Sequence, residues 1–509
     1  MICRLFWRHT KVTNSFITNF PLFTIVLSLF SGPLCYMLKR RMARYWTIGL
    51  ECGLIAMVSA VLWYTMTTGS SFTYVMGEFP APWGNEIRAG VLEALIALVF
   101  LLVMLSSVIG GSKYIDIDID ESKINLYYTL INLMTAALMA MVWTNDIFTG
   151  YVFLEILTLT SCGILIVREI GRTTLAAVRY MIMNLLGSGL FLLGVVLLYD
   201  VTGNLLMVPM QEEIAKLITN SQNMMAITMG LGILTIGLCI KSGLFPFHYW
   251  MPDTYGWATP TSGAVLSSLV SKCYIFLLFK IYYRVIGIEV FEQLPIRNIL
   301  LVLGLMGMVA GSVSAMRANN INRMVAFSSA AQIGYIYMGI GIGGKVGYTA
   351  AMFHVMAHAV TKSTLFLTTP RLSDVSGGSL LFRNLQGSGI RDRAAGVYFS
   401  VASLSMIGIP IFAGFSSKLL FAEAAVDSGS MTKMVLVMIA LALSSMLNAI
   451  YFIRTMIRIY QPDTTGIRVS AKRVSYQIPM IILTVMNLAL GLFSWYFAGM
   501  IEQGLSMFG

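Results

Sequence analysis

Long apolar runs separated by short polar loops fill almost the whole chain. Each run holds about 18–25 mostly apolar residues, the length that a helix needs to cross the hydrocarbon core of a bilayer. The pattern therefore predicts fourteen membrane-spanning helices and an all-α polytopic membrane protein. The predicted spans are residues 16–38, 45–64, 91–109, 124–142, 147–167, 175–199, 224–247, 260–283, 299–316, 321–342, 346–369, 397–425, 431–460 and 476–501.

Two of these helices contain a helix breaker beside a lysine. The seventh has Lys241 and then Pro246, and the twelfth has Gly408-Ile-Pro410 about two turns before Lys418. A charge at mid-membrane costs roughly 2.5–3.5 kcal/mol on insertion scales, and backbone carbonyls freed by a break must be satisfied by protein or water. Paired interruptions in two halves indicate inverted repeats around a midplane site. A lysine at a helix end with an ordinary kink is the alternative.

The grouping of helices into two repeats divides the chain into four predicted segments. Residues 1–123 hold three peripheral helices, and residues 124–284 form the first inverted five-helix repeat. The second repeat covers residues 285–460, and residues 461–509 supply the last helix. The seventh and twelfth helices, the broken ones, occupy the two repeats.

Composition supports the membrane assignment and excludes several kinds of site. Of 509 residues, 57% are hydrophobic and 11% are charged, against about 25% charged residues in soluble proteins. The six cysteines show no Cys-x-x-Cys spacing, and we found no nucleotide-binding or His-Glu-x-x-His motif in a suitable context. We therefore expect no cofactor, metal cluster or disulfide framework in this chain.

The net charge of +11 reflects topology rather than nucleic-acid binding, because most basic residues lie in short loops. The loops on one side carry 19 lysines and arginines, among them Arg468, Lys472 and Arg473, against 9 on the other. The positive-inside rule then places both termini outside a cell (inner or cytoplasmic) membrane. The apolar run after Arg4, Arg8 and Lys11 extends to Leu38, so we expect a retained first helix rather than a signal peptide.

Six basic residues fall inside the predicted spans. Lys280 is near enough to a helix end for its amine to reach the interface. Glu155 lies in the middle of the fifth span; a buried Glu–Lys pair of variable separation would act as a proton gate, because burial favours the neutral amine and a near carboxylate favours the charged one. A static salt bridge from Glu155 to Arg179 is the alternative. The six are Arg179, Lys241, Lys272, Lys280, Lys362 and Lys418.

Titratable residues also mark the later helices. Lys272 is near the middle of the eighth span and has no sequence-local partner, while His354, His358 and Lys362 follow at four-residue spacing on one face of the eleventh. Histidine relays protons near neutral pH; packed core histidines and, less favoured, a zinc site are alternatives. Lys418, before Glu423, is placed near an exit to water. We interpret Asp253 as a turn or capping residue, and Glu51, Glu93 and Asp146 as interfacial.

The run Lys241-x-x-Leu-Phe-Pro-Phe-His248-x-Trp-x-Pro-Asp, with Pro260 and Lys272, resembles the signature of the antiporter-like subunits of respiratory complex I, the Mrp cation/proton antiporters and the membrane-bound hydrogenases. The likeness extends from about residue 124 to 460, and the chain length looks closest to a Mrp D-type or hydrogenase-type subunit. The resemblance implies two half-channels joined by a polar axis. It pairs Glu155 with Lys241, makes Lys272 the link and the histidines a relay, and makes Lys418 the terminal carrier, with Arg179, His248, Pro246 and Pro410 in support.

The sequence thus predicts a membrane subunit that moves protons, with sodium exchange left open, and that has no redox chemistry of its own. We expect other membrane subunits as partners, with a peripheral redox module or an opposing ion gradient as the driving force. A stand-alone transporter of a small anion and a structural membrane anchor are the rival hypotheses.

Overall fold

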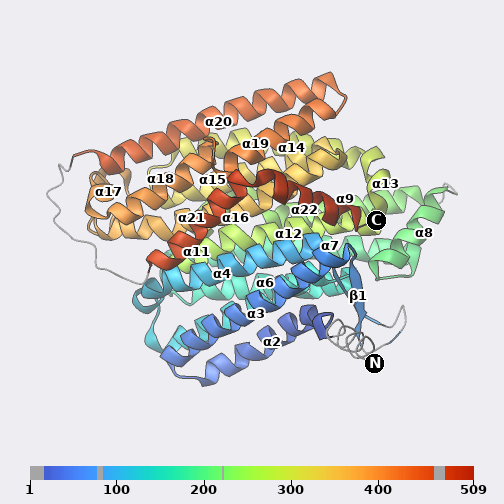
Figure 1. Cartoon of the computed structure of the whole chain (residues 1–509), viewed down its shortest axis with the longest axis horizontal. Helices are drawn as coiled ribbons and strands as arrows, with labels where there is room; N and C mark the ends of the chain where they lie inside the picture. The colour runs from blue at the N-terminus through green and yellow to red at the C-terminus, as the bar shows by residue number, and fades with distance from the viewer. Residues whose placement is uncertain (1–15, 77–78, 80–83, 220–222, 463–475, 509) are drawn as a thin grey trace, which may run out of the picture.

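The computed structural model describes residues 16–76, 79, 84–219, 223–462 and 476–508. Long helices lie side by side across the molecule, from α2 and α3 at the lower edge of Figure 1 to α20 at the upper edge. The predictions made for the basic residues at the two ends fall outside the described residues; these are Arg4, Arg8, Lys11, Arg468, Lys472 and Arg473.

The first part of the chain forms long helices and one short hairpin. Strands β1 (Phe72–Val75) and β2 (Glu86–Ala89) pair antiparallel between the second and third long helices, with Phe72 opposite Ala89. This hairpin adds a small sheet that the sequence pattern did not predict. The helices are α2 (Phe20–Met37), α3 (Arg40–Thr68), α4 (Val91–Asp118), η2 (Glu121–Lys123), α5 (Ile124–Trp143), α6 (Ile147–Ile166), α7 (Gly171–Thr202) and α8 (Met207–Thr219).

The middle of the chain is helical but repeatedly irregular. Two π-helical segments, η4 and η5, flank the short helix α12; η4 lies within the predicted eighth span, and η5 extends four residues beyond its end. The elements are α9 (Met224–Ser242), η3 (Phe247–Trp250), α10 (Met251–Trp257), α11 (Pro260–Val265), η4 (Leu266–Val270), α12 (Ser271–Ile281), η5 (Tyr282–Gly287), α13 (Ile288–Gln293) and α14 (Pro295–Arg317).

The last part contains the longest buried helix, α16, and ends in a bent pair, because α21 and α22 meet at 81°. The elements are α15 (Ile321–Ile342), α16 (Gly344–Asp374), η6 (Phe382–Asn384), α17 (Ser388–Arg391), α18 (Arg393–Ile407), α19 (Ala413–Asp427), α20 (Met431–Tyr460), α21 (Gln477–Leu492) and α22 (Ser494–Ser506).

Helices occupy all fourteen predicted ranges. Within the described residues, eleven helical stretches are long and apolar enough to cross a membrane, or twelve if the bent pair is one span. Besides the bent pair, the predicted ranges that fall outside this set are the eleventh, which carries two histidines and a lysine, and the broken twelfth. The eleventh range contains the titratable residues, and the twelfth the helix-breaking residues, on which the predicted site depends.

The predicted breaks of the seventh and twelfth helices are confirmed, and the two have the same backbone pattern. Gly243 and Gly408 adopt positive φ (77° and 93°), and each amide bonds to carbonyls three and four residues back. The next amide, of Leu244 or Ile409, bonds back five residues, which is the Schellman ending of a helix. The glycine therefore ends each helix, and the proline (Pro246 or Pro410) lies two or three residues beyond it.

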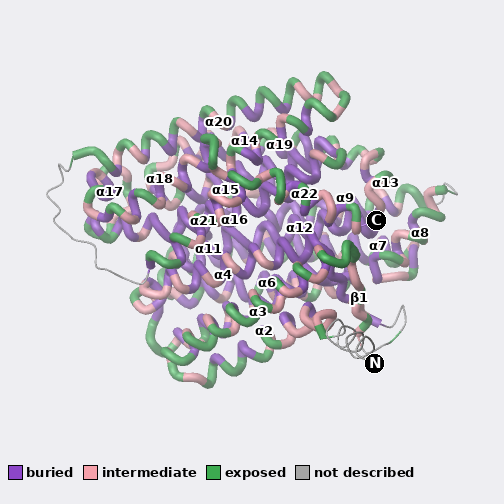
Figure 2. The backbone as a smooth tube through the Cα atoms, in the orientation of Figure 1, coloured by how far each residue is buried: buried purple, intermediate pink, exposed green. Residues whose placement is uncertain are grey.

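Burial is greatest along the centre of the bundle, where α12, α15 and α16 are almost wholly enclosed by other helices (Figure 2). The outer faces of α3, α7 and α20 expose apolar side chains, as lipid-facing helices do. Polar side chains on the central helices are thus held by protein rather than by lipid.

Candidate functional site

Lys241, in the last turn of α9, is fully buried. Its amine donates a hydrogen bond to Thr158 Oγ1 of α6 at 2.7 Å and lies 5.3 Å from the ring centre of Tyr274. Thr158 Oγ1 is also 3.2 Å from the Tyr274 hydroxyl. Tyr274 belongs to α12, two residues after Lys272, so this triad connects Lys241 to the helix of the central lysine.

Glu155 is one helical turn from Thr158 on α6, so both side chains share a face. No ion pair within 4.0 Å joins Glu155 to Lys241 in the described structure. Among the described residues, Glu155 Oε1 is a buried atom without a hydrogen-bond partner. Thr158, which holds the Lys241 amine one turn from Glu155, is therefore the residue of α6 in direct contact with Lys241.

The centre of the molecule holds two further buried lysines. Lys272 donates to the Ser267 carbonyl, within the π-helical segment η4, and to Ser271 Oγ at 3.2 Å. Its partners are therefore sequence-local, contrary to the prediction. Lys362 of α16 donates to the Val325 carbonyl at 2.8 Å and to Ser328 Oγ, both on α15.

The two histidines of α16 stack on each other, with ring centres 5.9 Å apart and planes at 9°. His354 Nδ1 is 2.6 Å from Ser417 Oγ, on the helix that carries Lys418. Among the described residues, neither ring nitrogen of His358 has a hydrogen-bond partner, and neither does His354 Nε2. Buried polar atoms of this kind are usually paired with water.

Lys418 reaches back across the break between α18 and α19. Its amine donates to the Ile407 carbonyl at 2.6 Å and to Ser445 Oγ of α20 at 2.9 Å. It also lies 5.7 Å from the Tyr335 ring centre. The residue is only partly buried, in keeping with the predicted position near an exit.

Lys272, Lys362 and Lys418 lie on or beside the helix of the two histidines. Lys362 is on α16 itself, and the segments that hold Ser267, the partner of Lys272, and Lys418 both pack against α16. Among the described residues, no carboxylate lies within 4.0 Å of any of these three amines. Like charges at short range disfavour one another's ionised form, so a proton on one group disfavours a proton on the next. We call the seven residues Glu155, Lys241, Lys272, His354, His358, Lys362 and Lys418 the buried axis.

Arg179 is not the partner of Glu155. Its side chain is 52% exposed and pairs with Asp253 at 2.8 Å, which also meets Arg323 at 3.4 Å. Asp253 lies in the first turn of α10, close to the helix start where a turn or capping residue is expected. His248, in η3, stacks on Phe245, with ring centres 5.7 Å apart.

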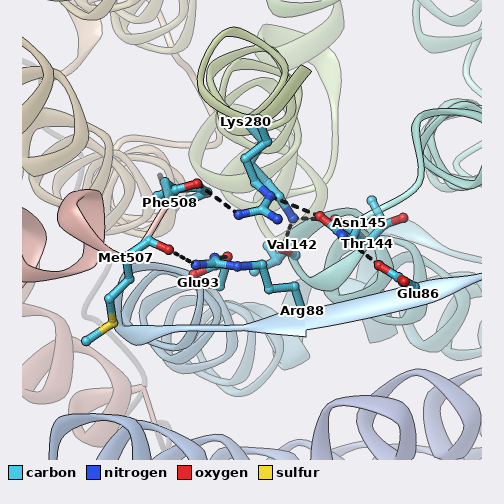
Figure 3. A network of polar contacts seen from close by, with 10 residues as sticks. Glu86, Arg88, Glu93, Val142, Thr144, Asn145, Lys280, Met507 and Phe508 are labelled. Atoms are coloured by element: carbon cyan, nitrogen blue, oxygen red, sulfur yellow. Dashed lines mark hydrogen bonds and ion pairs between the residues drawn. The ribbon is translucent and has the colours of Figure 1, made fainter. Parts of the chain in front are cut away.

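Lys280 does not reach the interface as predicted. It is fully buried and donates to the carbonyls of Val142 (2.8 Å) and Thr144, at the C-terminal end of α5 (Figure 3). Arg88 and Arg284 similarly donate to the carbonyls of Met507 and Phe508 at the end of α22. Cations are favoured at carbonyl ends of helices, so this cluster joins two helix ends.

Two acidic residues interpreted as interfacial are also buried. Glu93 has no exposed surface and pairs with Arg88 inside the same cluster. Glu51, equally buried on α3, accepts a hydrogen bond from Thr135 at 2.7 Å. Asp146 does lie at a helix end: it caps α6 by accepting from the Thr149 amide, and burial raises the pKa of its carboxyl.

Comparison with known proteins places this geometry in a family. Residues 144–444, more than half of the chain, match the model of the NADH:quinone oxidoreductase/Mrp antiporter transmembrane family. The chain belongs to this family. The matched region contains every residue of the buried axis and both Schellman-type breaks.

Relatives and solved structures agree with the assignment. NADH-quinone oxidoreductase subunit N of Desulforudis audaxviator is 28% identical over 505 residues, covering 94% of this chain and 96% of the relative. The fold resembles a chain of the archaeal membrane-bound sulfane sulfur reductase (TM-score 0.86, 23% identity, 97% of both chains). It also resembles a chain of the Mrp complex of Dietzia (TM-score 0.85, 20% identity, 96% of this chain and 97% of the other).

Proposed function

We propose that this chain is a proton-translocating subunit of a multisubunit membrane complex. Protons pass along the buried axis, from Glu155 and Lys241 through Lys272, Lys362 and the two histidines to Lys418. The chain itself needs no cofactor: the driving force comes from a redox module or an ion gradient in partner subunits.

The observation that carries the proposal is a series of six bases, five of them buried and Lys418 partly buried, none of which has a carboxylate in direct contact among the described residues. Hydroxyl and carbonyl oxygens hold each amine. These oxygens accept a hydrogen bond from the charged amine and also from the neutral amine, which still has N–H donors. Either protonation state can therefore occupy the site. A structural salt bridge would instead fix the proton. The ring nitrogens of His358, free of protein partners, are suited to hydrogen-bonded water between Lys272 and Lys418.

The relatives support a shared assembly. The solved proteins with this fold are components of the Mrp complex and of a respiratory membrane complex. We propose that this chain likewise packs against other membrane subunits in a cell membrane. The positive-inside count favours termini on the outer side.

The test is proton uptake by vesicles that contain the assembled complex. With Lys241→Ala, we expect uptake to fall to the background rate, because the first amine of the series is lost. Lys216→Ala removes an exposed lysine paired with Glu213 and should leave uptake unchanged. Full uptake by an assembled Lys241→Ala complex would contradict the proposal.

Transport measurements also separate the rival hypotheses. Normal ion transport after joint replacement of Lys241 and Lys418 would favour a structural anchor. Uptake of a small anion by the purified single chain would favour a stand-alone transporter. Repeating the proton assay with and without sodium measures whether the two ions exchange.

A further inference from the structure

We propose that the outer face of α20 binds an anionic phospholipid, with the phosphate on Arg454 and Arg458. α20 forms the upper edge of the molecule in Figure 1 and has one side free of other helices. A shallow groove of about 450 Å³ follows this side. Its lining residues are Met446, Ala449, Ile450, Ile453, Arg454, Ile457, Arg458 and Gln461.

The arginines give the groove one charged end. Arg454 and Arg458 are four residues apart, so they share a face in the last two turns of α20. In the described part of the chain neither has an ion-pair or hydrogen-bond partner. Two adjacent guanidinium groups match a phosphate in geometry and charge. The C-terminal dipole of α20 favours a cation here, but it does not account for the groove.

The apolar part of the groove has the length of one lipid leaflet. Met446, Ile450, Ile453 and Ile457 are each 43–55% exposed and follow one stripe. From 446 to 457 the helix rises about 16 Å at 1.5 Å per residue, close to half of the roughly 30 Å hydrocarbon core. An acyl chain in one leaflet therefore fits beside the stripe when its phosphate meets the arginines.

A phospholipid fits better than a helix from another subunit. A helix would have to bring an acidic group to the exposed Arg454 and the partly buried Arg458, whereas anionic headgroups are present at that depth. The basic end lies on the side that the positive-inside rule assigns to the cytoplasm. Lipid binding itself does not depend on the proposed transport function.

The experiment measures lipid retention by native mass spectrometry of the purified protein, titrated with phosphatidylglycerol or phosphatidylcholine. Arg454→Gln/Arg458→Gln should weaken phosphatidylglycerol binding about tenfold or more and leave phosphatidylcholine unchanged, since each surface cation contributes to anionic-lipid affinity. The control Lys39→Gln/Arg41→Gln removes two exposed charges from the same predicted side, next to α3 at the opposite edge of the molecule from α20, and should bind like the parent. Ile453→Trp, which fills the groove but keeps both arginines, should also bind more weakly.

Three outcomes would overturn the proposal. Equal binding by the arginine variant and the parent would show that the arginines hold no lipid, and an equal loss in the control would reduce the effect to net charge. If a photo-crosslinking residue placed at position 450 of the assembled complex crosslinks to another subunit, that subunit covers the groove. Crosslinking to lipid instead, with selective loss of phosphatidylglycerol binding in the arginine variant, supports the proposal.

Discussion

At the scale of single residues, the buried amines are stabilised by hydroxyls and backbone carbonyls rather than by carboxylates. Lys241 bonds to Thr158, Lys362 to Ser328 and Lys418 to Ser445. A hydroxyl both accepts and donates, so it can pass a proton while it remains in place. The hydroxyl partners are therefore part of the proposed route.

Thr158→Val tests this role with little change of shape. The lost hydrogen bond to an amine is worth roughly 1.5–3 kcal/mol, so we expect proton uptake to fall about tenfold or more. Thr160→Val is the matched control, because the Thr160 hydroxyl bonds only to carbonyls of its own helix. Uptake that falls equally in both variants would indicate a general effect on α6.

The sequence located the buried bases but not their partners. The free-energy cost of a charged side chain inside the membrane singles out Lys241, Lys272, Lys362 and Lys418, because each lies within an apolar span. Thr158 had a signal, since it shares a face with Glu155 one turn away. Lys280 and Arg179 were misjudged for one reason: hydropathy gives depth along a helix, not which neighbour the side chain meets.

At the scale of elements, the breaks position the lysines. Gly408 has φ +93°, and a Cβ there would lie 2.9 Å from Cδ of Lys418. The side chain of Lys418 thus passes directly over the glycine to reach the Ile407 carbonyl.

Gly408→Ala should displace Lys418 and reduce proton uptake severalfold, in addition to the strain of a left-handed alanine, about 1–2 kcal/mol. Gly429→Ala is the control with the same strain: its φ is +65° and nothing lies within 4 Å of its Cβ position. Both variants should lose similar stability, measured by thermal unfolding, but only the first should lose uptake. Equal proton uptake by the two variants would show that the break at Gly408 does not position Lys418 for transport.

Lys280→Met tests the cap on α5. Two buried carbonyls lose their donor, each at a cost of about 1–3 kcal/mol, so we expect the free energy of unfolding in detergent to fall by roughly 2–6 kcal/mol. Lys345→Met removes an exposed lysine paired with Glu502 and should change stability by less than about 0.5 kcal/mol. An unchanged Lys280→Met protein would rule out the capping role.

Element positions were largely predictable, because apolar length sets each span. The irregularities were not. The π-helical segments η4 and η5, the 81° bend between α21 and α22 and the β1–β2 hairpin leave no mark in the pattern of apolar runs. The division into repeats and the seven-residue proton route remain predictions.

At the scale of the whole molecule, the proposed route runs in series. Lys241 is joined through Thr158 and Tyr274 to the helix of Lys272, and His354 is joined through Ser417 to the helix of Lys418. A route in series is blocked by the loss of any member.

We therefore expect Lys241→Met and Lys418→Met each to bring proton uptake close to background, and the double variant to be no lower than either. Measured in vesicles with the assembled complex, this non-additivity distinguishes one path from two. If each single variant kept about half of the uptake and only the double variant abolished it, the halves would conduct independently.

Backbone carbonyls in a π-helical segment or at helix ends accept hydrogen bonds from three of the lysines. Ser267 holds Lys272, Ile407 holds Lys418, and Val142 with Thr144 holds Lys280. Side-chain replacement leaves such oxygens untouched, so an alanine scan of the surroundings would miss them. Replacing single amides by esters, one position at a time, would instead weaken each carbonyl as an acceptor and expose its part in holding charge.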